Sequence, residues 1–309
     1  MNPAFSVIFL TTLTGAGQGL FLALFAATLA APGRVPAGFA VAASAVSVVL
    51  LVLGLIASFF HLGRPERAWR SAARWRTSWL SREVIALPAF TAAVFVYGAA
   101  KWQGFEPAAA WIGAAASVLC VALFVCTGMI YACIRFLQEW ATPLTVVNYV
   151  LLGSASGTML AAALAAYLVP DLAPGYADAA TVITLAALAT RALSLVRNAR
   201  LRPKSTTQTA IGIKHPSIRQ ISPGFTGSSF NTREFFHHRT REFLRAIKWI
   251  FLVLAFPLPL VLLWTGSILA IPAAIAFAFA VQYVGLLAER WFFFAQANHP
   301  QNLYYALTG

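Results

Sequence analysis

Long apolar stretches alternate with shorter polar connections along almost the whole chain. Eight stretches are long enough to cross the core of a bilayer, which takes about 20 apolar residues in a helix. They cover residues 5–30, 39–60, 83–100, 108–131, 144–168, 178–196, 247–265 and 267–289. The pattern predicts an all-α, polytopic integral membrane protein. We expect residues 1–309 to form one membrane domain with eight transmembrane helices in two four-helix bundles.

Composition supports a membrane location. Hydrophobic residues make up 60% of the 309 residues, charged residues make up 10%, and the mean hydropathy is +0.76. A soluble domain needs more polar surface than this, whereas a lipid-facing surface does not. No basic segment precedes the first apolar stretch and no small-residue cleavage site follows it. We therefore expect a retained helix there and not a signal peptide.

The basic residues fall almost entirely on one side of the predicted membrane. Of the 22 Lys and Arg residues, 20 lie on the side that the termini share. Six arginines occupy the second connection, Arg135 the fourth, twelve basic residues run from Arg191 to Lys248, and Arg290 follows the last stretch. The positive-inside rule then places both termini and the long basic loop in the cytoplasm. The expected location is the bacterial cytoplasmic (inner) membrane.

The only long connection is the loop of residues 197–246. It is basic, yet it also contains the aromatic residues Phe225, Phe230, Phe235 and Phe236, which free linkers tend to lack. We therefore expect this loop to become ordered against a partner protein. Its positive charge would attract an acidic partner, and high salt should then weaken assembly.

The second connection contains the strongest candidate site. His61 ends the second apolar stretch and Glu83 opens the third, so the connection returns both side chains to the same interface. A histidine and a buried carboxyl group can each accept a proton near neutral pH. Oxidation of a hydroquinone releases two protons and needs hydrogen-bond partners for two oxygens, which this pair could supply. The alternative is that His61 marks a helix end and Glu83 interacts with a positive helix N-terminus.

Other cofactor sites find little support in the sequence. None of the five histidines lies in the middle of a predicted helix, whereas a membrane haem commonly takes axial histidines from helices. We therefore expect no haem and no metal site in this chain. Cys120, Cys126 and Cys133 match no metal motif, and we interpret them as small packing residues. The stretch from Gly15 to Gly19 has the spacing of helix-packing motifs, and Gln18 within it could line a cavity.

Several segments together resemble one known family. They are the amino-terminal Asn2-Pro3-Ala4-Phe5-Ser6-Val7-Ile8-Phe9, the His-Leu-Gly-Arg-Pro stretch from His61, Thr77-Ser78-Trp79-Leu80-Ser81-Arg82-Glu83, the stretch from Glu139 to Tyr149, and the stretch from Ser229 to His237. The chain resembles the membrane-anchor subunits of the dimethyl sulfoxide reductase type, the DmsC family, which is related to the NrfD-type anchors. The resemblance extends over essentially the whole chain.

The resemblance implies a haem-free, eight-helix anchor that binds a quinone, either menaquinone or ubiquinone. Such an anchor exchanges electrons with an iron–sulfur subunit that holds [4Fe–4S] clusters and is itself bound to a molybdopterin catalytic subunit. It implies quinone-site roles for His61 and Glu83, with Arg67, and less closely Arg64, matching the arginine of the same loop. We assign subunit docking to Arg233, Glu234, Phe235 and Phe236.

The functional alternatives are therefore three. The first is a quinone-reactive anchor, and the chain resembles sulfite-oxidising anchors more than anchors that oxidise menaquinol for dimethyl sulfoxide reduction. In either kind of anchor, another subunit would catalyse the reaction of the terminal substrate. An ion-translocating or transport subunit would need charged or broken helices near the bilayer midplane. A purely mechanical anchor would not respond to quinol-site inhibitors. The terminal substrate and the direction of electron flow do not follow from the sequence.

Overall fold

The structure, a computed structural model, describes residues 1–219, 221–222 and 230–304, with residues 230 and 231 as backbone only. Within these residues the regular secondary structure is entirely helical and there is no β-strand. Eight segments are long and apolar enough to cross a membrane, which confirms the predicted number. The expected all-α membrane fold is therefore correct.

The first five membrane segments are single helices: α1 (Phe5–Ala30), α2 (Ala37–Phe59), α3 (Trp79–Trp102), α4 (Glu106–Ala132) and α5 (Pro143–Leu168). The sixth comprises the short η2 (Pro170–Leu172) and α6 (Ala173–Ala199), and the seventh comprises α9 (Arg241–Ala255) and α10 (Pro257–Ile268). The eighth is α11 (Pro272–Ala295). It ends beyond the predicted boundary at residue 289, because the apolar sequence from Trp291 to Phe294 continues the helix.

Helix ends coincide with residues that suit them. Pro143, Pro257 and Pro272 each begin a helix, where the missing proline N–H has no intrahelical role. Ser78 caps α3 by accepting a hydrogen bond from the backbone N–H of Ser81 at 3.3 Å. Thr240 caps α9 in the same way. These local signals fix where each of these helices starts.

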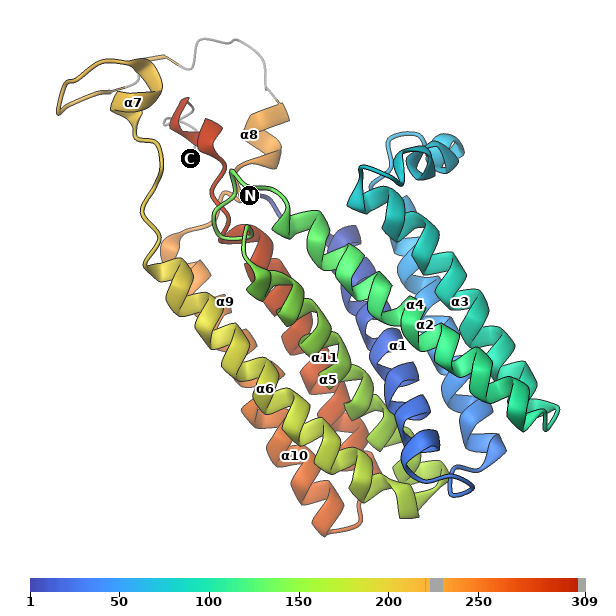
Figure 1. Ribbon diagram of the computed structural model, residues 1–309. Coiled ribbons are helices and arrows are strands. Elements are labelled where there is room, and N and C mark those ends of the chain that lie inside the picture. Colours follow the sequence, from blue (N-terminus) through green and yellow to red (C-terminus); the bar gives the residue numbers. More distant parts are fainter. Residues whose placement is uncertain (220, 223–229, 305–309) are drawn as a thin grey trace.

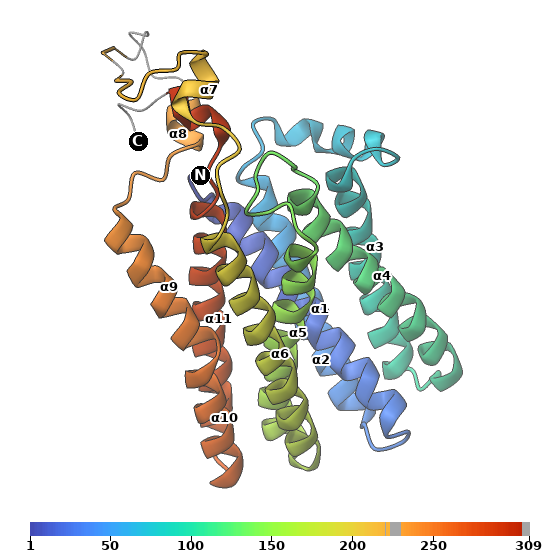
Figure 2. The same ribbon diagram turned by 60° about the vertical axis from the view of Figure 1, so that its left-hand side comes forward.

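The eight segments pack as two four-helix bundles, as expected (Figures 1 and 2). Helices α1 to α4 form the first bundle, in which α1 packs against α2, α2 against α3, and α3 against α4. Helices α5, α6, α9–α10 and α11 form the second, in which α5 packs against both α6 and α11. The main contact between the bundles is α1 against α5.

Glycines allow α1 and α5 to approach closely. A Cβ atom added at Gly157 would lie only 2.1 Å from the backbone nitrogen of Leu20, and one at Gly19 would lie 2.3 Å from the carbonyl oxygen of Gly153. No side chain fits at these two positions without separating the helices. The packing role that the sequence indicated for the stretch from Gly15 to Gly19 is therefore confirmed. We call this contact the glycine seam.

One end of the bundles carries the polar extramembrane segments. There lie η1 (Pro65–Arg74), α7 (Thr207–Ile211), α8 (Phe230–Glu234) and η3 (Pro300–Tyr304), together with Met1 (Figure 1). We call it the arginine-rich end. Two of the residues counted toward its charge belong elsewhere: Arg191 lies within α6 and Arg290 within α11, and both are buried.

Candidate functional site

The first part of the site is the connection between α2 and α3. His61 follows the last turn of α2, and Arg64 and Arg67 lie at the start of η1, all three exposed. Arg67 lies 3.9 Å from the carboxylate of Glu66, an exposed ion pair of small energetic value. Partial burial lowers the pKa of His61, which favours the neutral imidazole, the form that can accept a proton.

Arg82 holds this connection against α3. Its Nε donates to the carbonyl oxygen of Trp75 and its Nη2 to that of Arg76, both at 2.9 Å. Its guanidinium carbon lies 4.2 Å from the centroid of the Trp79 ring, a cation–π contact. The arginine next to Glu83 therefore fixes the path of the loop that carries His61.

Glu83 itself lies in the second turn of α3 and is only 8% exposed. Its Oε1 accepts a short hydrogen bond of 2.5 Å from the hydroxyl of Thr127 on α4. An acidic side chain at this depth is costly and is usually functional. The hydrogen bond orients the carboxyl group between the two helices.

The structure places His61 and Glu83 at the same end of the first bundle but does not join them. Within the described residues, no hydrogen bond or ion pair connects Glu83 with His61, Arg64 or Arg67. The direct partner of Glu83 is Thr127, which the sequence analysis did not select. A single threonine in an apolar helix gave no signal, because such residues commonly bond to their own backbone.

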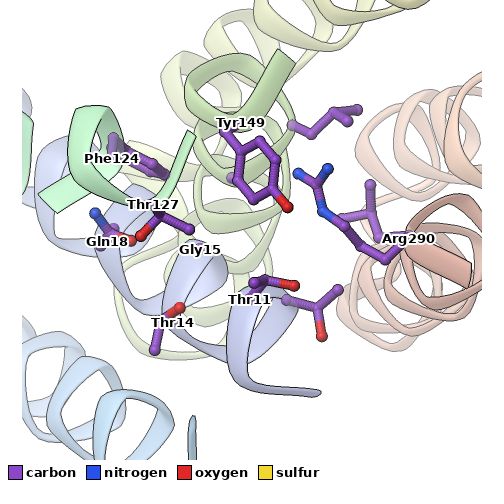
Figure 3. A pocket seen from close by; sticks show the side chains of 12 residues that line it. Thr11, Thr14, Gly15, Gln18, Phe124, Thr127, Tyr149 and Arg290 are labelled. Atoms are coloured by element: carbon purple, nitrogen blue, oxygen red, sulfur yellow. The ribbon is translucent and has the colours of Figure 1, made fainter. Parts of the chain in front are cut away.

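A small polar cavity lies between the two bundles beside Thr127. Its volume is about 10 Å³, close to that of one water probe. Figure 3 shows Tyr149 and Arg290 on one side of it, and Thr127 and Gln18 on the other. Gln18 donates to the carbonyl oxygen of Cys120 at 3.1 Å and lines the cavity, as its sequence position suggested.

A cluster of buried charges adjoins this cavity. Arg191 Nε lies 2.8 Å from Glu289 Oε1, and Arg290 Nη1 lies 3.5 Å from Glu289 Oε2. All three side chains are at most 5% exposed. The guanidinium of Arg290 also lies 3.7 Å from the centroid of the Tyr149 ring. Two arginines and one glutamate leave this cluster with one unbalanced positive charge.

Aromatic side chains close the cavity toward the arginine-rich end. The rings of Tyr131, Trp140, Tyr149, Phe293 and Phe294 contact one another at centroid distances of 5.3 to 5.9 Å. The indole N–H of Trp140 donates to the carbonyl oxygen of Phe293 at 3.0 Å. The polar interior is therefore separated from the solvent at that end.

The proposed docking segment packs against the ends of the chain. Phe235 stacks on His299 with centroids 3.8 Å apart, and its carbonyl oxygen accepts a hydrogen bond from Asn302 at 3.2 Å. Phe236 is half-buried, while Arg233 and Glu234 are exposed. Ser229, in the motif before them, lies outside the described residues. Docking by this segment stays a prediction.

Other buried polar side chains form hydrogen bonds between helices. Asn148 on α5 donates to Ser194 of α6 at 2.7 Å and accepts from Thr190 at 2.9 Å. Gln282 donates to the carbonyl oxygen of Ala255 at 3.3 Å, which satisfies an acceptor at the break between α9 and α10. Among the described residues, no group of three or more His, Cys, Asp or Glu side chains could hold a metal ion.

Comparisons with known proteins agree on one family. The family model described as DMSO reductase anchor subunit (DmsC) matches residues 1–295. A curated protein from Allochromatium vinosum, named as a subunit of sulfite dehydrogenase, is 54% identical over 321 aligned positions. The alignment covers 99% of each of the two chains. The residues that the family model matches include the eight membrane segments, the connection with His61 and the buried cluster.

Proposed function

Because the chain belongs to the family of DMSO reductase anchor subunits (DmsC), we propose that it exchanges electrons between the membrane quinone pool and an iron–sulfur subunit. That partner holds [4Fe–4S] clusters and delivers electrons to, or takes them from, a molybdopterin catalytic subunit. The terminal reaction is sulfite oxidation, a proposal supported by the name of the 54% identical relative. The anchor itself does not act on sulfite.

The observation that carries this proposal is Glu83. It is a carboxyl group inside the membrane domain, near the end of the bundle where a soluble partner can dock, and Thr127 orients it. A quinol releases two protons when it is oxidised, and a quinone takes up two when it is reduced. Glu83 and His61 can each accept or donate one of them. The electrons then pass directly to the partner subunit.

The available space constrains where a quinone ring can bind. The cavity beside Thr127 holds about one water molecule, whereas a small-molecule site is typically hundreds of Å³. The ring therefore approaches Glu83 from the side of the η1 connection. There the imidazole of His61 offers a hydrogen-bond partner for one quinone oxygen, and Arg67 and Arg64 supply positive charge at the interface.

The basic residues of the arginine-rich end determine the proposed orientation in the membrane. The arginine-rich end lies in the cytoplasm of a bacterial inner membrane, because basic residues accumulate on that side. The iron–sulfur subunit binds there, on the exposed arginines of η1 and on the segment from Arg233 to Phe236. An ion-translocating function finds less support, because among the described residues the buried charges of Glu83, Arg191, Glu289 and Arg290 lie in the half of the helices toward the arginine-rich end, and buried Lys101 lies at the opposite end of α3.

The test uses the complex purified from its native membrane. Glu83→Gln and His61→Ala should abolish quinone-linked turnover while turnover with a soluble dye at the catalytic subunit persists, which shows that the complex still assembles. Glu106→Gln is the matched control, because Glu106 is an exposed carboxylate paired with Lys101 at the opposite end. Normal quinone-linked turnover in both site variants would refute the assignment.

The composition of the same preparation tests the wider proposal. Molybdenum, iron and acid-labile sulfide should co-purify with the chain, and the complex should turn over sulfite. If the complex is active with dimethyl sulfoxide and not with sulfite, the proposed function becomes menaquinol oxidation coupled to dimethyl sulfoxide reduction. A preparation without metals, after loss of partners has been excluded, would favour the transport function.

A further inference from the structure

The polar cavity between the bundles contains a side chain whose bonding is incomplete. Tyr149 is 3% exposed, and its hydroxyl has no hydrogen-bond partner among the described residues. In Figure 3 this hydroxyl points toward the space that Thr11 and Arg290 also border. A buried hydroxyl without a partner loses its hydrogen bonds to water without replacement, so native proteins rarely leave one unsatisfied.

The dimensions and the lining of the cavity suit one particular ligand. The cavity has room for about one water molecule, and a buried water typically makes about three hydrogen bonds. Tyr149, Thr127 and Arg290 all line the same space. The guanidinium offers donors only, whereas each hydroxyl can donate or accept. An apolar ligand would leave these groups unsatisfied, and any larger polar ligand would not fit.

We propose that the cavity binds one water molecule, which joins the Glu83–Thr127 pair of the first bundle to Tyr149 and Arg290 of the second. Thr127 already donates its hydrogen to Glu83, so its oxygen remains able to accept one from the water. Tyr149 and Arg290 thereby act as positioning residues for Glu83. This positioning role rests on the proposed function, whereas the water site does not.

The charges around the site give this bridge an electrostatic role. Tyr149 lies within electrostatic range of Glu83, Glu289 and Arg290. The cluster of Arg191, Glu289 and Arg290 carries one excess positive charge, and the negative charge that Glu83 gains when it loses its proton balances it across the water. The other ionisable groups around Glu83 are Arg82 on α3, and Cys126 and Tyr131 on α4. In a low-dielectric interior, a water molecule that is polarised by one charged group strengthens its hydrogen bonds to the others.

Infrared difference spectroscopy of the purified complex tests the site. Spectra recorded between neutral and acidic pH should show a water O–H stretching band that shifts in H2-18O, after long equilibration because aromatic rings close the cavity. Tyr149→Phe should remove this band. Tyr176→Phe is the matched control, because Tyr176 also has a buried hydroxyl without a partner but does not line the cavity. In that variant the band should persist.

The position of the Glu83 vibration provides the second measurement. The carboxyl or carboxylate band that Glu83→Gln removes should shift in frequency in Tyr149→Phe and stay unchanged in Tyr176→Phe. The inference fails if the wild-type complex has no 18O-sensitive band, or if Tyr149→Phe alters neither band. The first result would point to a direct hydrogen bond between Tyr149 and its stacked neighbour Tyr131. None of these spectra requires quinone turnover, so a failure of the proposed function is detected separately.

Discussion

The buried ion cluster predicts a large loss of stability from one substitution. Glu289→Gln removes the counter-charge of two buried arginines, one 2.8 Å and the other 3.5 Å away. Removing one partner of a buried ion pair costs roughly 3–5 kcal/mol, because the remaining charge stays desolvated. Each kcal/mol lowers the midpoint of thermal unfolding by about 2–4 °C in a large domain. We therefore expect a decrease of about 6–20 °C.

The control is a second ion pair, Lys101 with Glu106, which lies in the first bundle at the end opposite the arginine-rich end. Lys101 and Glu106 lie even closer, at 2.6 Å, but the side chain of Glu106 is 62% exposed. Exposed pairs contribute about 0–1 kcal/mol, so Glu106→Gln should lower the midpoint by less than about 4 °C. If distance decided the effect, this variant would be the less stable of the two. The comparison therefore separates burial from proximity.

The measurement is thermal unfolding of the solubilised chain, followed by tryptophan fluorescence. Equal midpoints for Glu289→Gln and Glu106→Gln would refute the reasoning. Glu289→Asp keeps the charge with a shorter side chain and should give an intermediate midpoint. If Glu289→Gln yields no folded protein, a folded Glu289→Asp variant still distinguishes loss of charge from loss of shape.

Three further predictions concern other parts of the molecule. Gly157→Ala should destabilise the chain by at least about 1–3 kcal/mol in the same unfolding assay, because the added Cβ would meet the backbone of α1. Gly175 lies in open space on α6, so Gly175→Ala should be neutral or slightly stabilising. Burial lowers the pKa of His61 below its ordinary value of 6.5. The unfolded chain then binds more protons at this site, so stability should fall as the pH drops below 6.5, and His61→Gln should reduce that dependence in unfolding midpoints measured against pH. Raising salt should weaken association of the complex in sedimentation experiments, and salt-independent association would point to apolar docking.

The sequence predicted the membrane segments well because their signal is strong. Each segment carries enough apolar residues to cross the bilayer, and the glycines of α1 have the spacing of a helix contact. The seventh segment was placed correctly although Pro257 divides it into two helices. Its length and composition satisfy the bilayer requirement, and Gln282 satisfies a carbonyl at the break.

The polar interior was predicted only in part, for a physical reason. Glu83 was found because an acidic residue opening an apolar helix is unusual. Arg290 was placed after the last segment, and the boundary was set at residue 289, because charges normally mark where a helix leaves the membrane. The mutual pairing of Glu289 and Arg290, and the pairing with Arg191, allows them to lie inside instead. Such pairing depends on helices far apart in sequence, so no local pattern reveals it.

The glycine seam also constrains the order in which the protein can assemble during synthesis. Helix α1 is made first, but its partner α5 emerges only after the three intervening helices. Until then, the surface shaped by Gly15 and Gly19 must face lipid or a chaperone in the insertion machinery. The α1 surface of the first bundle is therefore covered only after α5, the first helix of the second bundle, has been inserted. If the ribosome stalls after α4, the membrane would contain only the first bundle, with the glycine surface of α1 uncovered.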